Sequence, residues 1–229
     1  MGSEMCIRDS PYKASSAMKS APSRSDIKDA VAQLLAADAP VIWAGQGVLY
    51  AEAADQLKEL AELTQTPVIT TMQAKSVFPD DHPLALGSAN RTAPKSVFKW
   101  LGAADTVFAV GSGLTRTTFG IDIPPGKFMI QANVAAEDIN KDYDIDIGLV
   151  GDAKLTLDLM LDEVKAALGE DGRETNSILI EKIAQTRKEW LDEWSPLLNS
   201  DEVPVNPYRV CLLYTSDAAD DTPCVDLGG

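Results

Sequence analysis

Two short glycine-containing turns are the residues of this 229-residue chain whose types and spacing could bind a ligand. Each follows an apolar run of strand type, PVIWA in the first case and TVFAV in the second. Glycine lets backbone N–H groups approach a phosphate closely, and a following helix N-terminus favours negative charge. Glycine also permits a tight strand-to-helix turn, so each turn alone leaves both explanations open; two turns together favour a binding edge. The residues concerned are Gly45, Gln46, Gly47, Gly111, Ser112 and Gly113.

The two turns do not complete a dinucleotide-binding fingerprint. In G-x-G-x-x-G the sixth position is glycine, whereas here it is Tyr50 for the first turn and Arg116 for the second. The next expected strand, PVITT, ends in threonines, where a dehydrogenase places an acid for the ribose hydroxyls. The sequence therefore disfavours a plain NAD-dependent oxidoreductase.

Two isolated side chains could also do chemistry. Arg116 follows the second turn closely enough to hold a phosphate or an adenylate bidentately, although a loop arginine is as often solvated. His82 is the only imidazole of the chain and follows Asp80 and Asp81, so that it could orient a base. We favour a polar loop for His82, because no nucleophile or metal partner stands near it in the sequence.

The two ends of the chain carry an unusual pair of motifs. All three cysteines lie in or just after MCIRDS and CLLYTS, and the reverse complement of a back-translated MCIRDS encodes the start of CLLYTS. That DNA resembles the end sequence of transposase-based sequencing libraries. We therefore expect residues 1–10 and 211–229 to be adapter read-through, which leaves Pro11–Val210 as an internal fragment.

Composition bounds the function of this fragment. The two ends hold one of the 20 basic and six of the 35 acidic residues. Residues 11–210 therefore contain 19 basic and 29 acidic residues and have a net charge near −10. Nucleic acid is an unexpected partner for so acidic a chain. No run of 18 apolar residues predicts a membrane span, and the acidity is ordinary for a cytoplasmic protein. Without cysteine, the fragment lacks disulfides and thiolate zinc sites.

The elements that must position these residues alternate between strand-like and helical patterns. This alternation predicts an α/β fold with a doubly wound, mostly parallel, six-stranded Rossmann-like sheet. Carboxyl ends of parallel strands meet at one edge, so both glycine turns are expected at the same edge. We expect strands within 40–47, 66–71, 105–113, 127–134 and 146–152. We expect helices from a cap at Ser25 to Pro40, over 51–65, 93–104 and 153–168 with Asp152 as cap, and over 175–194.

Two regions receive more specific predictions. The Pro and Gly spacing of residues 72–90 argues against regular structure across that segment. In the last helix, Trp190 and Trp194 share a helical face with Ile180, Ile183 and Arg187. We expect these tryptophans to pack against a neighbouring domain rather than to form a ligand platform.

The order of motifs resembles a known family. APVIWAGQGV, LAELTQTPVITT, KSVFPDDHPLALG, ADTVFAVGSGLT and KFMIQANVAAEDINKDYDIDIGLVGDAKLTLDLML follow one another with family-like spacing over about residues 25–168. Together they resemble the central domain of thiamine-diphosphate-dependent enzymes of the acetolactate synthase, or acetohydroxyacid synthase, group. Any one of these motifs is weak, whereas five in the right order are specific.

The resemblance implies a domain plan and a function. Residues 11–24 would be the linker from an N-terminal pyrimidine-binding domain, 25–169 the central domain, and 170–210 the helix and connector to a C-terminal diphosphate-binding domain. The parent would use thiamine diphosphate and Mg²⁺, bound outside this fragment, to decarboxylate a 2-oxo acid or ligate its two-carbon unit. It would be a homodimer or homotetramer, and the fragment alone would be inactive.

The resemblance also bears on the glycine turns, because central domains of this family often bind FAD or an ADP-like nucleotide there. It carries Gly45, Gln46, Gly47, Gly111, Ser112, Gly113, Arg116 and Asn133 over as candidate contacts. Two departures weaken this inference: Gly113 stands where flavin-binding members have arginine, and Asn133 and Ala135 stand where they have Asp-x-Asp. We therefore expect any nucleotide binding to be weak or lost.

Two other classes of protein share features with this sequence. One is a stand-alone FAD or nucleotide-binding module of the electron-transfer-flavoprotein type, which shares this kind of sheet. Family-like linkers on both sides of the domain favour the thiamine-diphosphate enzyme over it. The other is a sirtuin-like deacylase, which we discount because its usual four-cysteine zinc site has no counterpart in residues 11–210.

Overall fold

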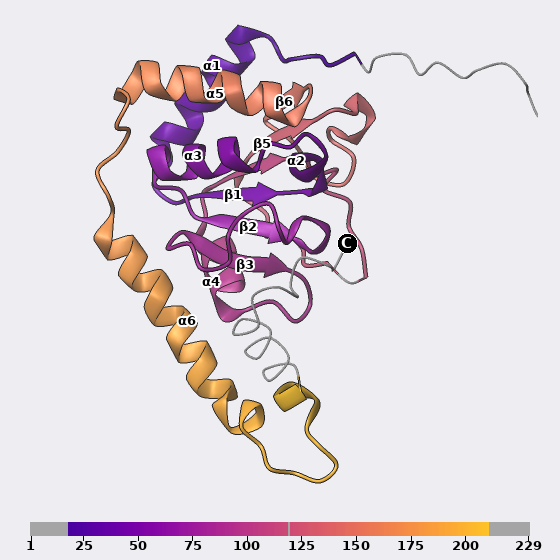
Figure 1. The fold of residues 1–229 in the computed structure, drawn as a ribbon. Helices are drawn as coiled ribbons and strands as arrows, with labels where there is room; N and C mark the ends of the chain where they lie inside the picture. The colour runs from indigo at the N-terminus through magenta and orange to yellow at the C-terminus, as the bar shows by residue number, and fades with distance from the viewer. Residues whose placement is uncertain (1–17, 119, 211–229) are drawn as a thin grey trace, which may run out of the picture.

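The computed structural model describes residues 18–118 and 120–210, which form one α/β layered domain with a trailing helix (Figure 1). Six parallel strands are ordered β3-β2-β1-β4-β5-β6. The predicted doubly wound sheet is therefore confirmed. The strands are β1 (Pro40–Ala44), β2 (Val68–Thr71), β3 (Ala85–Ala89), β4 (Thr106–Val110), β5 (Phe128–Asn133) and β6 (Ile147–Val150).

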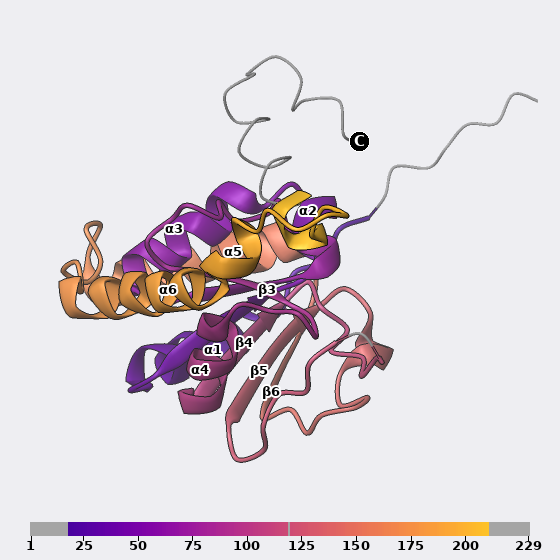
Figure 2. The same ribbon diagram turned by 90° about the horizontal axis from the view of Figure 1, so that it is seen from below.

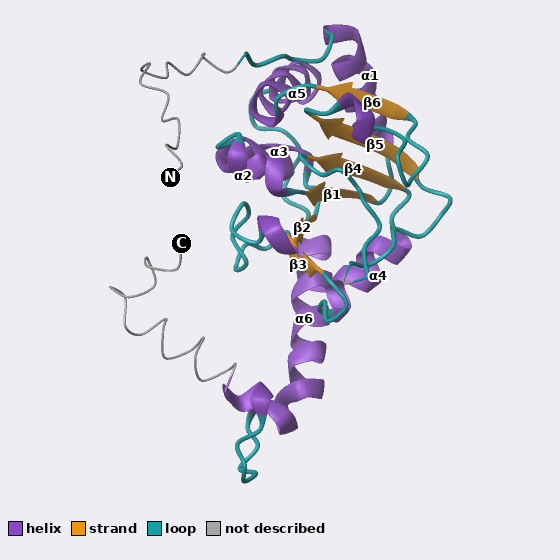
Figure 3. Cartoon of the chain, turned by 90° about the vertical axis from the view of Figure 1, so that its right-hand side faces the viewer, coloured by secondary structure: helices purple, strands orange, loops and turns teal. Residues whose placement is uncertain are grey.

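Helices cover both faces of this sheet. They are α1 (Arg24–Ala36), α2 (Gln46–Tyr50), α3 (Ala54–Thr64), α4 (Lys95–Ala103), α5 (Ala153–Leu168) and α6 (Ser177–Leu198), with 3₁₀ turns η1 (Met72–Ala74) and η2 (Ala136–Asp138). The helices α3 and α5 pack side by side, and α1 packs on α5 and on the edge strand β6. Figures 2 and 3 show α4 across the sheet from α3. None of the helices in the described ranges is long and apolar enough to span a membrane.

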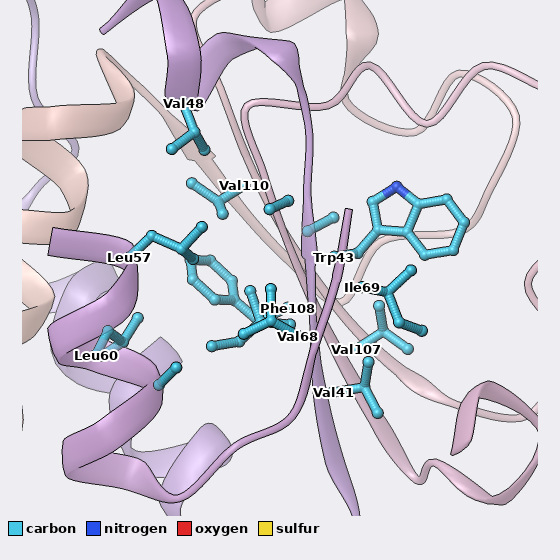
Figure 4. Close-up of a cluster of buried hydrophobic side chains, with 14 of the residues drawn as sticks. Val41, Trp43, Val48, Leu57, Leu60, Val68, Ile69, Val107, Phe108 and Val110 are labelled. Atoms are coloured by element: carbon cyan, nitrogen blue, oxygen red, sulfur yellow. The ribbon is translucent and has the colours of Figure 1, made fainter. Parts of the chain in front are cut away.

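The core lies on both sides of the central strands, because a strand in a parallel sheet is buried on both faces. Leu57 and Leu60 of α3 face Phe108 on one side of the sheet (Figure 4). Trp43 and Val107 point to the other side (Figure 4). All five are buried, which explains why β1 and β4 read as continuous apolar runs.

Local capping chemistry sets the helix ends. The Asp152 carboxylate accepts a hydrogen bond from the Leu155 N–H at 3.1 Å, so the predicted cap of α5 is confirmed, and Gly169 ends that helix at φ 88°. The first helix begins earlier than predicted. Ser23 rather than Ser25 caps α1, because its hydroxyl accepts from the Asp26 N–H at 3.2 Å.

The prediction of no regular structure across residues 72–90 was wrong, because β3 lies within this segment and forms an edge of the sheet. Its sequence, ALGSA, has few residues of high strand propensity, so its local signal is weak. Tertiary contacts hold it instead. It pairs with β2, the Thr70 and Ser88 hydroxyls lie 2.9 Å apart, and the Ser96 hydroxyl of α4 donates to the Leu86 carbonyl at 2.6 Å.

The last helix, α6, leaves the sheet and packs mainly along α4 (Figure 1). Trp190 and Trp194 are half-buried with ring centroids 6.2 Å apart, and Trp194 meets the Tyr208 ring edge-on at 4.9 Å. The expected packing of these tryptophans against another domain stays a prediction. The expected adapter segments, 1–10 and 211–229, lie outside the described residues.

Candidate functional site

A cavity of about 390 Å³ lies at the carboxyl ends of the central strands. The chain leaves β1 toward β2 on one side and reaches β4 on the other, so the strand order reverses between β1 and β4. Open α/β sheets bind ligands at this position. Both glycine turns lie here, as the sequence predicted: one follows β1 and the other follows β4.

The glycines of the two turns pack against each other. Gly45 N–H donates to the Val110 carbonyl at 2.8 Å, and Gly47 N–H donates to the Gly111 carbonyl at the same distance. A Cβ on Gly47 would stand 2.7 Å from the Gly111 Cα, and Gly111 itself has φ 64°. Close packing of two turns is therefore sufficient to explain these glycines. Their N–H groups are also committed within the protein, which leaves them unable to cradle a phosphate without rearrangement.

The helix that follows the first turn adds little to anion binding. The α2 helix has only five residues, and Gly45 is its N-cap. Its short length limits the dipole that the nucleotide interpretation assumed. The side chain of Gln46 donates to the Tyr50 hydroxyl at 2.7 Å, within the same helix.

The lining of the cavity includes most of the residues that the sequence singled out. Gln46, Gly47, Gly111, Ser112, Gly113 and Asn133 all line it. Gly45 and Arg116 are not among the lining residues. Whether any of these residues contacts a nucleotide stays a prediction.

Arg116 is held beside the cavity by neighbouring side chains. Its guanidinium carbon lies 4.6 Å from the centroid of the Tyr143 ring, and its Nε lies 3.6 Å from Asp122. The hydrogen bond with Tyr143, helped by the nearby carboxylates, raises the pKa of Arg116 above its ordinary value. Its backbone N–H donates to the Asp142 carboxylate at 2.8 Å. Tyr143 itself lines the cavity, so the Arg116 guanidinium lies next to a lining residue without being one.

The cavity has an acidic group that the sequence analysis missed. Asp138, in the η2 turn, lines the cavity and accepts a hydrogen bond from the Asn133 amide at 3.0 Å. A Cβ on Gly113 would stand 2.9 Å from the Asp138 Oδ2, so glycine at 113 makes room for this carboxylate. Asn133 and Ala135 thus leave the end of β5 without an acid, while Asp138 places a carboxylate in the cavity from the following turn; whether it contacts a ribose stays a prediction. The signal was the acidic pair Glu137-Asp138 a few residues beyond the strand.

A buried amide joins the second glycine turn to the η2 turn. Gln131 is fully buried in β5, and its Nε2 donates to the Ser112 carbonyl at 3.1 Å and to the Asp138 carbonyl at 3.2 Å. Its Oε1 has no hydrogen-bond partner among the described residues. Since both carbonyls belong to cavity residues, Gln131 fixes the distance between Ser112 and Asp138.

His82 lies away from this cavity and serves the loop before β3. The Leu84 N–H donates to His82 Nδ1 at 3.1 Å, and His82 Nε2 lies 3.1 Å from the Glu62 carboxylate. The first contact leaves Nδ1 as an acceptor, so Nε2 carries the proton toward Glu62. This arrangement fits the polar-loop interpretation. In the described ranges no group of three or more His, Cys, Asp or Glu side chains could hold a metal ion.

A doubly wound parallel sheet with a cavity at its switch point defines a Rossmann-like α/β domain. The particular family follows from the sequence: residues 27–160 match the thiamine pyrophosphate enzyme central domain family. The chain belongs to this family.

Known relatives agree with this assignment. The chain is 35% identical to the glyoxylate carboligase of Escherichia coli O157:H7 over 202 residues, which are 84% of this chain and 32% of the relative. It is 33% identical to the acetolactate synthase large subunit of Corynebacterium glutamicum over 153 residues, 66% of this chain and 24% of the relative. The chain thus spans about a third, or less, of the curated relatives it matches.

A solved structure shares the fold. Benzoylformate decarboxylase from Polynucleobacter necessarius superposes with a TM-score of 0.59 at 23% identity, covering 75% of this chain and 32% of that one. The family match and the curated relatives confirm the thiamine-diphosphate interpretation of the sequence, and the solved structure confirms the fold. They give no support to a stand-alone FAD module of the electron-transfer-flavoprotein type.

Proposed function

We propose that this chain is the central part of a thiamine-diphosphate-dependent enzyme that decarboxylates a 2-oxo acid or ligates its two-carbon unit to an acceptor. The observation that carries the proposal is the family match over residues 27–160, joined to relatives that are a carboligase and an acetolactate synthase. The parent acts as a homodimer or homotetramer. Residues 11–24 lead in from an N-terminal domain, and residues 170–210 lead on to a C-terminal one.

In this proposal the fragment contributes structure rather than chemistry. Thiamine diphosphate supplies the electron sink for 2-oxo acid chemistry, and its protein must hold the diphosphate through Mg²⁺. The described residues do not fit that task, since they contain no candidate metal cluster and the N–H groups of Gly45, Gly47 and Gly111 donate to backbone carbonyls of the protein. No catalytic step is therefore assigned to residues of this chain. Its role is to position the flanking domains relative to each other and to provide the cavity at the switch point.

The test compares the full gene product with the fragment. With thiamine diphosphate, Mg²⁺ and pyruvate, the full protein is expected to release CO₂ or to form a carboligation product. Residues 11–210 under the same conditions are expected to match the reaction without enzyme. Turnover by the fragment would contradict its scaffold role. Failure of the full protein to bind thiamine diphosphate would contradict the enzyme assignment separately.

We further propose that the cavity binds FAD or ADP weakly. The Asp138 carboxylate could accept from a ribose hydroxyl, but it already accepts from Asn133 and lies 3.4 Å from Lys141. The arginine that would hold phosphate or flavin is replaced by Gly113, which removes a charge-assisted contact of roughly 1.5–3 kcal/mol. Calorimetric titration of residues 11–210 with FAD and with ADP is the measurement. Submicromolar affinity for FAD would contradict the proposal of weak binding.

A further inference from the structure

A second cavity, of about 350 Å³, opens at the opposite edge of the sheet from the first. It lies beside the amino ends of β1 and β2, where Pro40 and Pro67 line it, and between α4 and the start of α6. These two helices pack against each other (Figure 1). We call this cavity the amino-edge cavity. It shares no lining residue with the cavity at the glycine turns.

Three cationic residues line the amino-edge cavity. They are Lys99 of α4, Lys182 of α6 and Arg173 of the segment before α6. None of the three forms an ion pair with a described residue, although the chain has 35 acidic against 20 basic residues. Two carboxylates, Asp38 and Glu174, also line the cavity, so its cations are in excess by one. Positive charge is therefore concentrated here in an otherwise acidic protein.

Two of these cations are held in place by neutral acceptors. The Lys99 ammonium donates to the Thr186 hydroxyl at 3.0 Å, and Thr186 is itself buried between the helices. The Arg173 guanidinium donates to the Thr64 carbonyl at 3.4 Å and to the Leu35 carbonyl. Positively charged groups that are fixed before binding lose less conformational entropy when an anion arrives. Their charges are not neutralised by the carbonyl and hydroxyl acceptors.

Apolar side chains make up part of the remaining wall, beside the polar Gln65 and Asn176. Trp100 of α4 is half-buried and packs against the core, the Lys99 ammonium lies 5.2 Å from the centroid of its ring, and Val41 and Leu179 are also on the cavity wall. A flat aromatic wall favours an aromatic or otherwise apolar body, and the cations beside it favour an anionic head. A volume of 350 Å³ lies within the range of small-molecule sites.

We propose that the amino-edge cavity binds a small carboxylate with an apolar, preferably aromatic, body. The carboxylate accepts hydrogen bonds from Lys99 and Lys182, and the body lies along Trp100. A ligand in this place bridges α4 and α6, so its binding holds the start of α6 against the sheet. The proposal does not depend on the activity proposed for the parent, because it concerns a different edge and requires no turnover.

Phenylacetate is the probe, and the signals of the four tryptophan indole N–H groups in NMR spectra of the full chain are the readout. We expect saturable shifts of the Trp100 signal, assigned from a Trp100→Phe variant, while Trp43 at the other edge stays unmoved. Phenylacetamide, which has the same shape without the charge, should bind roughly tenfold more weakly, as expected when charge-assisted hydrogen bonds become neutral ones.

Matched lysines on the same two helices supply the controls. Lys99→Met and Lys182→Met should each weaken phenylacetate binding roughly tenfold. Lys95→Met on α4 and Lys188→Met on α6 should leave it within about twofold, because these lysines pair with Glu193 and Asp192 and do not line the cavity. Absence of saturable binding, equal affinity for phenylacetamide, or equal losses in the control variants would each overturn the proposal.

Discussion

At the scale of single residues, the glycines of the two turns show how one residue type can serve packing at a place where binding is expected. Close backbone contacts leave no room for a Cβ atom at Gly45, Gly47 and Gly111. Asp138, which no motif marked, is the charged group that the cavity contains. A residue that lines a cavity is thus best identified from the surroundings of its side chain rather than from its place in a motif.

The packing role of Gly47 leads to a stability prediction. Gly47→Ala places a Cβ 2.7 Å from the Gly111 Cα, a backbone atom that cannot move aside cheaply. We expect a loss of about 2 kcal/mol or more in the free energy of unfolding, measured by urea denaturation. Gly102→Ala is the control, because its Cβ meets nothing within 4 Å and glycine disfavours the α4 helix. That variant should gain about 0.5 kcal/mol. Equal effects of both substitutions would contradict the packing argument.

The loop histidine gives a second prediction at this scale. His82→Ala removes the acceptor of the Leu84 N–H and the partner of Glu62, so we expect a loss of about 1 kcal/mol in unfolding free energy. His82→Asn retains an acceptor at a similar position and should recover part of the loss. Neither change should alter turnover by the full gene product. A loss of turnover with unchanged stability would instead indicate a chemical role for His82.

At the scale of elements, caps and pairing partners decide where helices and strands begin. The two serines near the start of α1 allow a direct comparison. Ser23→Ala removes the hydroxyl that accepts from the Asp26 N–H and should cost about 1 kcal/mol in thermal or urea unfolding. Ser25→Ala should cost only a few tenths, because the Ser25 hydroxyl makes only exposed side-chain contacts, with Ser23 and Asp26. The opposite order would restore Ser25 as the cap.

The strand β3 illustrates an element that depends on its neighbours. Its Gly87 has φ 108°, and its pairing with β2 shifts register between Val68 and Ile69. The ladder to β2, together with contacts from α4, stabilises this strand despite its small residues. Such an element is expected to be weak in isolation, because most of its residues have low strand propensity.

At the scale of the whole molecule, the folded unit comprises the sheet and its helices, and the sequence predicts that the two ends of the chain were not selected with it. Deletion of residues 1–10 and 211–229 should therefore change the unfolding free energy by less than about 1 kcal/mol, the size of an ordinary single substitution. Urea unfolding of the full chain and of residues 11–210 measures this. A larger loss would show that the ends contribute to folding and would contradict the adapter interpretation.

The sequence by itself determined the fold class, the family and the edge at which the glycine turns lie. It could do so because buried parallel strands read as apolar runs, helices show their own period, and carboxyl ends of parallel strands meet at one edge. It also determined the cap at Asp152, because the capping hydrogen bond joins residues only three positions apart in the chain. Only the tertiary structure decided that Gly45 donates to the end of β4 and Gly47 to the second turn, that Asp138 reaches the cavity, and that ALGSA forms an edge strand. These outcomes depend on contacts between segments far apart in the chain, which local propensity and spacing do not encode.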